Sequence, residues 1–122
     1  MLQHESRVTI VDNSGAKKVM VIQKLGGSNK GLVRQGQVAV VVVKDSDLTR
    51  KKTHRSTIHR ALVIRSKISL PRTNTFRIRF DETAAILVNK KNLPLGSRIR
   101  GPVLQELCEK FPFIGTLSQV II

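Results

Sequence analysis

The strongest indication of the fold is the stretch Gln37-Val38-Ala39-Val40-Val41-Val42-Val43, in which five of seven residues are valine. β-Branched residues favour strands, and Gly36 supplies a turn just before the stretch. Because four valines are consecutive, we expect a strand that is buried on both faces, with residues 40–43 in the core. Periodicity alone leaves a buried helical segment open as an alternative.

Similar apolar or β-branched stretches lie on both sides of this one. We expect strands at residues 7–11, 19–25, 61–65, 76–80 and 84–88, separated by turn-forming residues at 12–15, 26–29, 71–74 and 92–96. Only residues 103–110 have the spacing of an amphipathic helix. The sequence therefore predicts a mainly β protein, a small barrel with a short C-terminal helical segment, in a single domain of residues 1–122.

One of these stretches, Phe76-Arg77-Ile78-Arg79-Phe80, alternates apolar and basic residues. Successive side chains of a strand point to opposite faces. The alternation predicts that the two phenylalanines and the isoleucine lie in the core and that both arginines face outward. We also expect Val63, in the stretch 61–65, to lie in the core.

The charge of the chain is its second strong feature. Its 122 residues include 22 Lys or Arg and 8 Asp or Glu, which gives a formal net charge of +14. The hydrophobic fraction of 40% excludes a disordered basic tail. No apolar run is long enough to span a membrane, and the N-terminus lacks the pattern of a signal or transit peptide. A small folded domain with this charge is expected to bind a polyanion, and nucleic acid is a better candidate than an anionic membrane or an acidic protein.

Most of the excess charge lies in the middle of the chain. Residues 44–79 carry 11 basic and 2 acidic side chains. The most basic part of this block, Arg50-Lys51-Lys52-Thr53-His54-Arg55, lies between two apolar stretches and cannot pack in a core. We expect either a flexible loop or an extended ribbon held against a partner, and a long loop in a compact domain is often functional.

The scarcity of certain side chains narrows the function further. The chain has no Trp, no Tyr and only four Phe, too few for the platforms on which single-strand binders stack bases. Contacts from Arg and Lys to the backbone of structured RNA fit better. Catalysis, metal binding and cofactors are not expected, because His4, His54 and His59 lack metal-ligand spacing and the lone Cys108 fits a packed helix face.

An ordered set of motifs that covers nearly the whole chain resembles one known family. The motifs are Val11-Asp12-Asn13-Ser14-Gly15-Ala16-Lys17-Lys18-Val19-Met20 with Leu25-Gly26-Gly27, Ala61-Leu62-Val63-Ile64-Arg65, Arg79-Phe80-Asp81, Ala85-Ile86-Leu87-Val88-Asn89, and Pro94-Leu95-Gly96-Ser97-Arg98-Ile99-Arg100-Gly101-Pro102-Val103 followed by Glu106-Leu107. Together they are similar to the large-subunit ribosomal protein fourteen family.

This resemblance implies a five-stranded β-barrel with a protruding β-ribbon and a short helical C-terminal part. It also implies a structural role in translation: binding large-subunit rRNA near ribosomal proteins three and nineteen, at the face that meets the small subunit. A bridge to small-subunit rRNA and docking of the ribosome silencing factor are further implications. A free RNA-binding β-barrel, such as an RNA chaperone, is the alternative, and the shortage of aromatic residues argues against it.

The candidate site residues are basic side chains for RNA and a C-terminal group for protein partners. We expect phosphate contacts from Lys17, Lys18, Arg50, Lys51, Lys52, His54, Arg55, Arg60, Arg65, Lys67, Arg72, Arg77 and Arg79. The resemblance implies a protein contact at Ser97, Arg98 and Phe113. For Arg98 and Arg100, contact with RNA and contact with protein are both expected alternatives.

The chain departs from the family pattern at three places. Thr75 follows Asn74 where the family has Gly, the basic block lacks the family's Lys-Lys-Gly element, and Phe113 occupies a position that is often basic. Such drift indicates an organellar member of the family. We therefore expect a ribosome of the mitochondrial matrix, with the chloroplast or the bacterial cytoplasm as alternatives.

Overall fold

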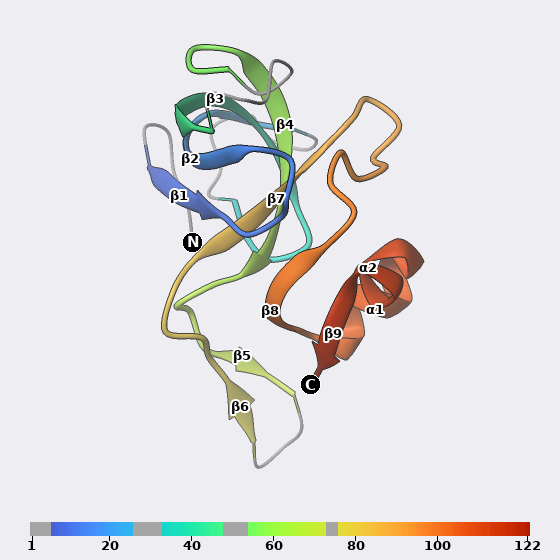
Figure 1. Ribbon diagram of the computed structural model, residues 1–122. Coiled ribbons are helices and arrows are strands. Elements are labelled where there is room, and N and C mark those ends of the chain that lie inside the picture. Colours follow the sequence, from blue (N-terminus) through green and yellow to red (C-terminus); the bar gives the residue numbers. More distant parts are fainter. Residues whose placement is uncertain (1–5, 26–32, 48–53, 73–75) are drawn as a thin grey trace.

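The computed structural model describes residues 6–25, 33–47, 54–72 and 76–122, and its centre is a closed barrel of five strands (Figure 1). Around the barrel lie β1 (Arg7–Ile10), β2 (Ala16–Lys24), β3 (Val38–Ser46), β4 (Ile58–Arg65) and β7 (Ala84–Val88), in that order. Neighbouring strands are antiparallel, except that β1 and β7 pair in parallel and close the barrel. The expected five-stranded β-barrel is confirmed.

The valine stretch forms most of β3, but it is not buried on both faces. Val41 and Val43 are buried, whereas Val40 and Val42 are only half-buried. The prediction that residues 40–43 all lie in the core is therefore wrong for two of the four. A barrel strand has one face toward the interior and one toward the outside, and the described part of the chain leaves the outer face of β3 partly exposed.

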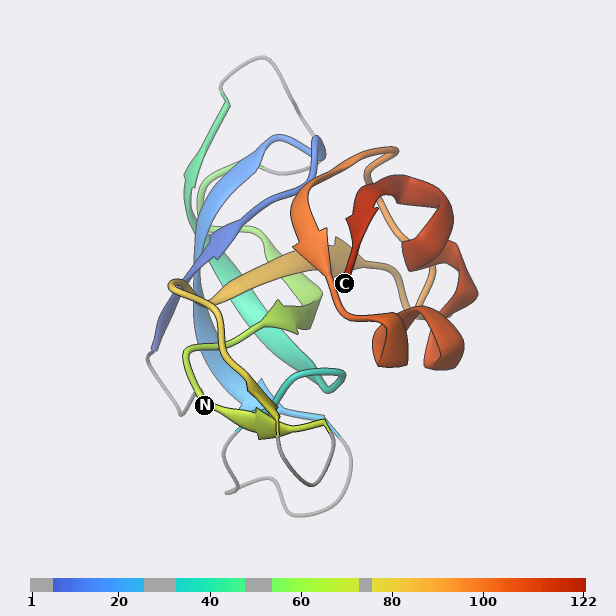
Figure 2. The same cartoon turned by 90° about the horizontal axis from the view of Figure 1, so that it is seen from below.

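A C-terminal layer covers the outside of the barrel at β4 and β7. It consists of β8 (Ile99–Val103), α1 (Gln105–Lys110), α2 (Pro112–Leu117) and β9 (Ser118–Ile121), with β8 and β9 paired in parallel. Figure 2 shows the two helices outside the barrel wall. An outer core cluster joins this layer to the barrel through apolar side chains that include Leu62, Ile64, Ile86, Leu107 and Ile114. Because of this cover, β7 is buried along its whole length.

The helical segment differs from the prediction in extent. The expected helix at residues 103–110 begins only at Gln105, because Val103 belongs to β8. The chain then turns at Phe111 and forms α2, which starts with Pro112, a residue suited to the first turn of a helix. Neither α2 nor β9 was predicted.

A second small sheet protrudes from the barrel as a ribbon between β4 and β7 in the chain (Figure 1). It pairs β5 (Leu70–Pro71) with β6 (Arg77–Ile78). Ile78 and Phe80 pack against the outer core cluster, as the alternating pattern predicts. Phe76 does not: it is 69% exposed, so its predicted place in the core is wrong. The alternating sequence pattern begins at Phe76, but the C-terminal layer covers only Ile78 and Phe80.

Candidate nucleic-acid interface

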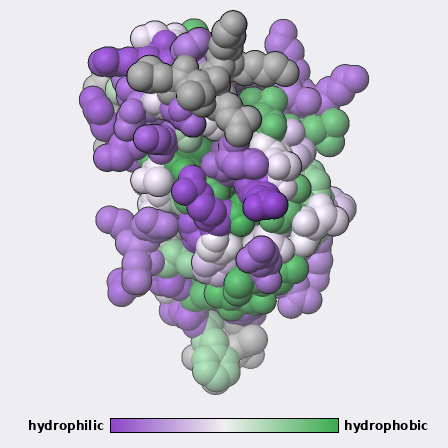
Figure 3. Space-filling model, viewed as in Figure 1, coloured by the Kyte–Doolittle hydropathy of each residue, from purple (hydrophilic) through white to green (hydrophobic). Residues whose placement is uncertain are grey.

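Most residues predicted to bind RNA that the structure describes are exposed. The face of the molecule drawn in Figure 3 is largely hydrophilic, with smaller apolar areas. The exposed ones are Lys17, Lys18, His54, Arg55, Lys67, Arg77 and Arg79. Arg60 and Arg72 are half-buried. Arg50, Lys51 and Lys52, together with the Asn74-Thr75 departure from the family pattern, lie outside the described residues.

Lys17 and Lys18 are both exposed although they are consecutive residues of one strand. In regular β structure one of them would point inward. The pairing of β2 with β3 changes register between Ala16 and Lys18 and again between Lys18 and Val19. A β-bulge of this kind redirects a side chain. The irregular start of β2 therefore presents two adjacent ammonium groups to the solvent.

Hydrogen bonds fix the backbone of residues 54–57, just before β4. The hydroxyl of Thr57 donates to the carbonyl of His54 at 2.6 Å, and the Thr57 backbone N–H donates to the same oxygen at 3.1 Å. Ser56 has a positive φ of 71°, and its N–H donates to Val43 at 2.8 Å. The exposed side chains of His54 and Arg55 thus stand on a tight turn that is bonded to β3.

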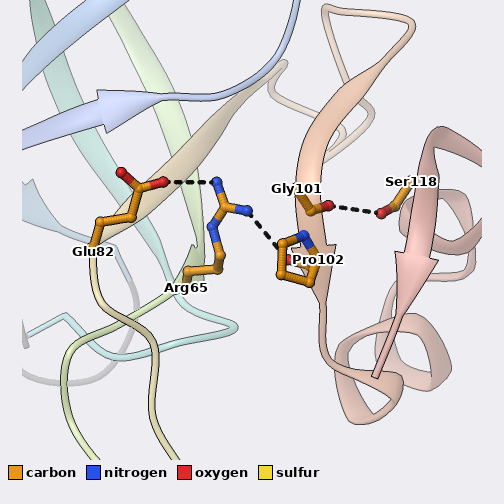
Figure 4. Close-up of polar contacts among 5 residues, drawn as sticks. All are labelled: Arg65, Glu82, Gly101, Pro102 and Ser118. Atoms are coloured by element: carbon orange, nitrogen blue, oxygen red, sulfur yellow. Dashed lines mark hydrogen bonds and ion pairs between the residues drawn. The ribbon is translucent and has the colours of Figure 1, made fainter.

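Arg65 is a correction to the predicted RNA surface, because it is only 4% exposed. Its guanidinium donates to Glu82 at 3.2 Å and to the carbonyl of Pro102 at 3.4 Å (Figure 4). Burial lowers the pKa of Arg65, and the nearby Glu82 carboxylate partly opposes that effect. Arg65 lies where the C-terminal layer covers the end of β4, so its guanidinium binds groups of the chain itself.

The close approach of Arg65 to β8 depends on Gly101. This glycine has a φ of +86°, and a Cβ built there would lie 1.9 Å from Nη1 of Arg65. The Gly101 carbonyl also accepts a hydrogen bond from the Ser118 hydroxyl at 3.2 Å (Figure 4). The glycine therefore lets the barrel, β8 and β9 meet at one point.

Two arginines of the protruding ribbon also make contacts within the chain. Nε of Arg72 donates to Glu106 at 2.9 Å, and Nη2 of Arg72 donates to the carbonyl of Ile122. These bonds tie the ribbon to the C-terminal layer. Arg77 donates to the hydroxyl and the carbonyl of Ser69, at 3.0 and 3.4 Å, but remains exposed.

The turn after β1 holds the segment that carries the expected protein contact. Asp12 is 3% exposed, and its carboxylate accepts hydrogen bonds from the N–H of Leu87 at 3.0 Å and from the N–H of Ser14 at 3.1 Å. Asn13 accepts hydrogen bonds from the N–H groups of Ser97 and Arg98, at 2.7 and 3.2 Å. The sequence pattern Asp-Asn-Ser-Gly indicated only a turn, so the structural role of Asp12 and Asn13 was missed. Its signal was present, because Asp and Asn are the residues whose side chains bond to nearby backbone.

This arrangement brings Arg98 and Arg100 close to Lys17, which sequence reasoning had placed in a different group. The three basic residues line one surface hollow of about 440 Å³, together with Asp12 and Asp47. The Arg100 guanidinium also donates to the carbonyl of Asp12 at 3.5 Å. The expected RNA contact on β2 and the expected protein contact before β8 therefore form one continuous surface.

Phe113 does not share the exposure of Ser97 and Arg98. It lies on α2, half-buried, and packs against the outer core cluster with its ring centroid 6.0 Å from that of Phe111. Its place in the cluster explains why an apolar residue suits this position. Much of its ring surface is therefore turned toward the chain itself.

The described residues contain no group of three His, Cys, Asp or Glu side chains that could hold a metal ion. Cys108 is half-buried on α1, and the pKa of its thiol is raised by burial and by the carboxylates of Glu106 and Glu109. A raised pKa disfavours the reactive thiolate at neutral pH. No helix within the described ranges is long and apolar enough to cross a membrane.

Comparison with known protein families gives a match over the whole chain. Residues 1–122 match the model of the family described as ribosomal protein L14p/L23e. The match spans the barrel, the ribbon and the C-terminal layer alike.

Proposed function

This chain belongs to the ribosomal protein L14p/L23e family, and on that premise we propose that its exposed cations bind large-subunit rRNA. Membership makes the protein a structural component of the large ribosomal subunit, with a role in translation and no enzymatic activity. The members of the proposed contact surface are Lys17, Lys18, His54, Arg55, Lys67, Arg77 and Arg79, with Arg60 at its edge. Arg50, Lys51 and Lys52 belong to the proposal on the strength of the sequence alone.

One observation carries this proposal: the exposed cations lie on backbone that the fold fixes, while one carboxylate is buried and two others are paired with arginines. Asp12 is buried among backbone donors, and Glu82 and Glu106 pair with Arg65 and Arg72. Each ion pair cancels one positive and one negative charge, whereas the burial of Asp12 removes a negative charge alone, so the exposed surface stays strongly positive. Binding of phosphates by such a surface releases counterions and depends steeply on salt.

We base the proposal of specific partners on the family resemblance and on the hollow beside β8. We place ribosomal proteins three and nineteen and a bridge to small-subunit rRNA among the neighbours of the protein. The silencing factor of idle ribosomes would dock at Ser97 and Arg98, with Arg100 beside them. Half-buried Phe113 would add an apolar edge to that contact rather than the charge usual in the family.

We further propose that the ribosome is a mitochondrial one, on the basis of the three departures from the family pattern. Subcellular fractionation with an antibody to the chain tests this point separately. Recovery in the mitochondrial matrix fraction is the expected result. Recovery in chloroplasts, or a bacterial source, would contradict it without affecting the role in the ribosome.

Sedimentation of native extract through a density gradient at moderate salt tests the main proposal. The expected result is co-migration of the chain with large subunits and whole ribosomes, and its release from them at high salt. A protein that stays at the top of the gradient at moderate salt would instead behave as a free RNA-binding barrel, and the proposal would fail.

A further inference from the structure

The β5–β6 ribbon carries an exposed aromatic side chain that the arrangement of the core does not explain. Of the four phenylalanines, Phe80, Phe111 and Phe113 pack against the outer core cluster, whereas Phe76 is 69% exposed. Phe76 is also the most exposed large hydrophobic residue among those that the structure describes. In Figure 3 an apolar surface stands at the end of the molecule where Figure 1 has the ribbon.

Phe76 has a defined backbone position near the tip of the ribbon, and its side chain is largely exposed there. Its carbonyl accepts a hydrogen bond from the N–H of Arg72 at 3.1 Å, which extends the ribbon by one pair beyond Pro71 and Arg77. Ile78, two residues later, packs against the outer core cluster. Phe76 therefore lies on a paired backbone position opposite Arg72, whose guanidinium bonds to the C-terminal layer, while its own side chain remains largely exposed.

The side chains that follow Phe76 fit a nucleic acid better than a protein partner. Arg77 and Arg79 are exposed, and Lys67 is exposed at the base of the same ribbon. Asp81 and Glu82 follow this stretch, and Glu82 is already paired with Arg65, so cations predominate around Phe76. An aromatic ring among cations is the combination with which proteins bind unpaired nucleotides: the ring stacks on the base, and the cations bind the phosphates on either side.

We propose that Phe76 stacks on an unpaired base of large-subunit rRNA, with Arg77 and Arg79 at the flanking phosphates. This inference rests on the proposed rRNA binding and deepens it, since it assigns to the ribbon a single-stranded nucleotide rather than a helix. A phenyl ring stacks on any of the four bases, so the contact selects an unpaired nucleotide and not a particular sequence.

A tryptophan reporter tests the stacking directly, because the chain has no Trp and no Tyr. In Phe76→Trp the single indole emission should be strongly quenched by large-subunit rRNA and hardly changed by an RNA duplex without unpaired nucleotides. Leu93→Trp is the matched control, since Leu93 is 50% exposed on the connection between β7 and β8, at the other end of the molecule (Figure 1). Its emission should change much less when the same rRNA binds.

A second set of variants separates the ring from mere apolar surface. Phe76→Leu keeps an apolar side chain but removes the π face, and should weaken rRNA binding about fivefold or more, while Phe76→Trp should bind at least as tightly as the original chain. All three exposed-site variants should keep the thermal midpoint of the original chain, which shows that any change in binding is not a loss of fold.

The outcomes distinguish this inference from the function on which it rests. If the original chain binds rRNA but Phe76→Leu binds equally well, or if Phe76→Trp is quenched no more than Leu93→Trp, base stacking is overturned and rRNA binding stands. If Phe76→Leu impairs assembly into subunits but not binding to naked rRNA, the partner of the ring is a protein, and base stacking is again overturned. If the original chain does not bind rRNA at all, both proposals fail.

Discussion

Two regions of the molecule use basic residues in opposite ways. In the seam between the barrel and the C-terminal layer, Arg65 and Arg72 bond to Glu82, Glu106 and backbone carbonyls. On the outer surface, side chains such as Lys18, Arg55 and Arg79 face the solvent. The comparison shows that a high count of Lys and Arg does not measure a binding surface, because part of the charge holds the fold together.

The most damaging change to the seam should be Gly101→Ala. An alanine there adopts a left-handed φ at a cost of about 1–2 kcal/mol, and its Cβ would displace the Arg65 guanidinium from its bonds, at about 1 kcal/mol more. We expect unfolding by urea to show a loss of about 2–3 kcal/mol in the free energy of unfolding.

The control for this change is the same substitution in an Arg65→Ala background. Removal of the guanidinium should remove the steric part of the penalty and leave the part due to backbone conformation. An equal cost in both backgrounds would show that Arg65 and Gly101 are not coupled, contrary to the description of the seam.

A somewhat smaller loss should follow from Asp12→Ala. The N–H of Leu87 would lose its acceptor inside the protein, and the Asp12-Asn13 turn would lose its bonds to Ser14, at a combined cost of about 2 kcal/mol. Asp81→Ala is a matched control, because it removes the same charge from an exposed position and should change stability little. If the two variants unfolded at the same urea concentration, the buried Asp12 carboxylate would not stabilise the fold.

The smallest effect in the seam should come from Arg72→Gln. Its ion pair with Glu106 is at the surface, since the Glu106 side chain is 55% exposed, and such pairs contribute less than about 1 kcal/mol. The bond from Arg72 to Ile122 is also lost, so we expect a lower thermal midpoint by a few degrees at most. A large loss of stability would mean that the ribbon depends on the C-terminal layer more than its contacts indicate.

The barrel could be predicted from the sequence because its strands are short apolar stretches separated by turn residues. The errors arise where a second layer changes which faces are buried. Val40 was placed in the core although nothing fully covers it, and Arg65 was placed outside although the C-terminal layer covers the end of β4. Whether these two residues are buried depends on residues far away in the sequence, so the local sequence pattern does not predict it.

The C-terminal layer was only partly predictable for a related reason. Residues 112–117 include Pro112 and Gly115, which obscure a helical pattern, and β9 exists because it pairs in parallel with β8. Parallel pairing leaves no turn signal in the sequence. At Phe76 the sequence carries a pattern that the fold does not use. Apolar and basic residues do alternate from Phe76 to Phe80, but the C-terminal layer leaves Phe76 exposed.

The measurement that tests the central claim most directly is the salt dependence of rRNA binding for one surface variant and one seam variant. Lys17→Gln with Lys18→Gln removes two exposed charges, and Arg72→Gln removes one charge from the seam. We predict that the slope of log K against log salt becomes shallower by about two for the surface pair and stays unchanged for the seam variant. If the slope is unchanged for the surface pair, or becomes shallower by about one for Arg72→Gln, the claim that surface cations bind RNA while seam arginines stabilise the fold is contradicted.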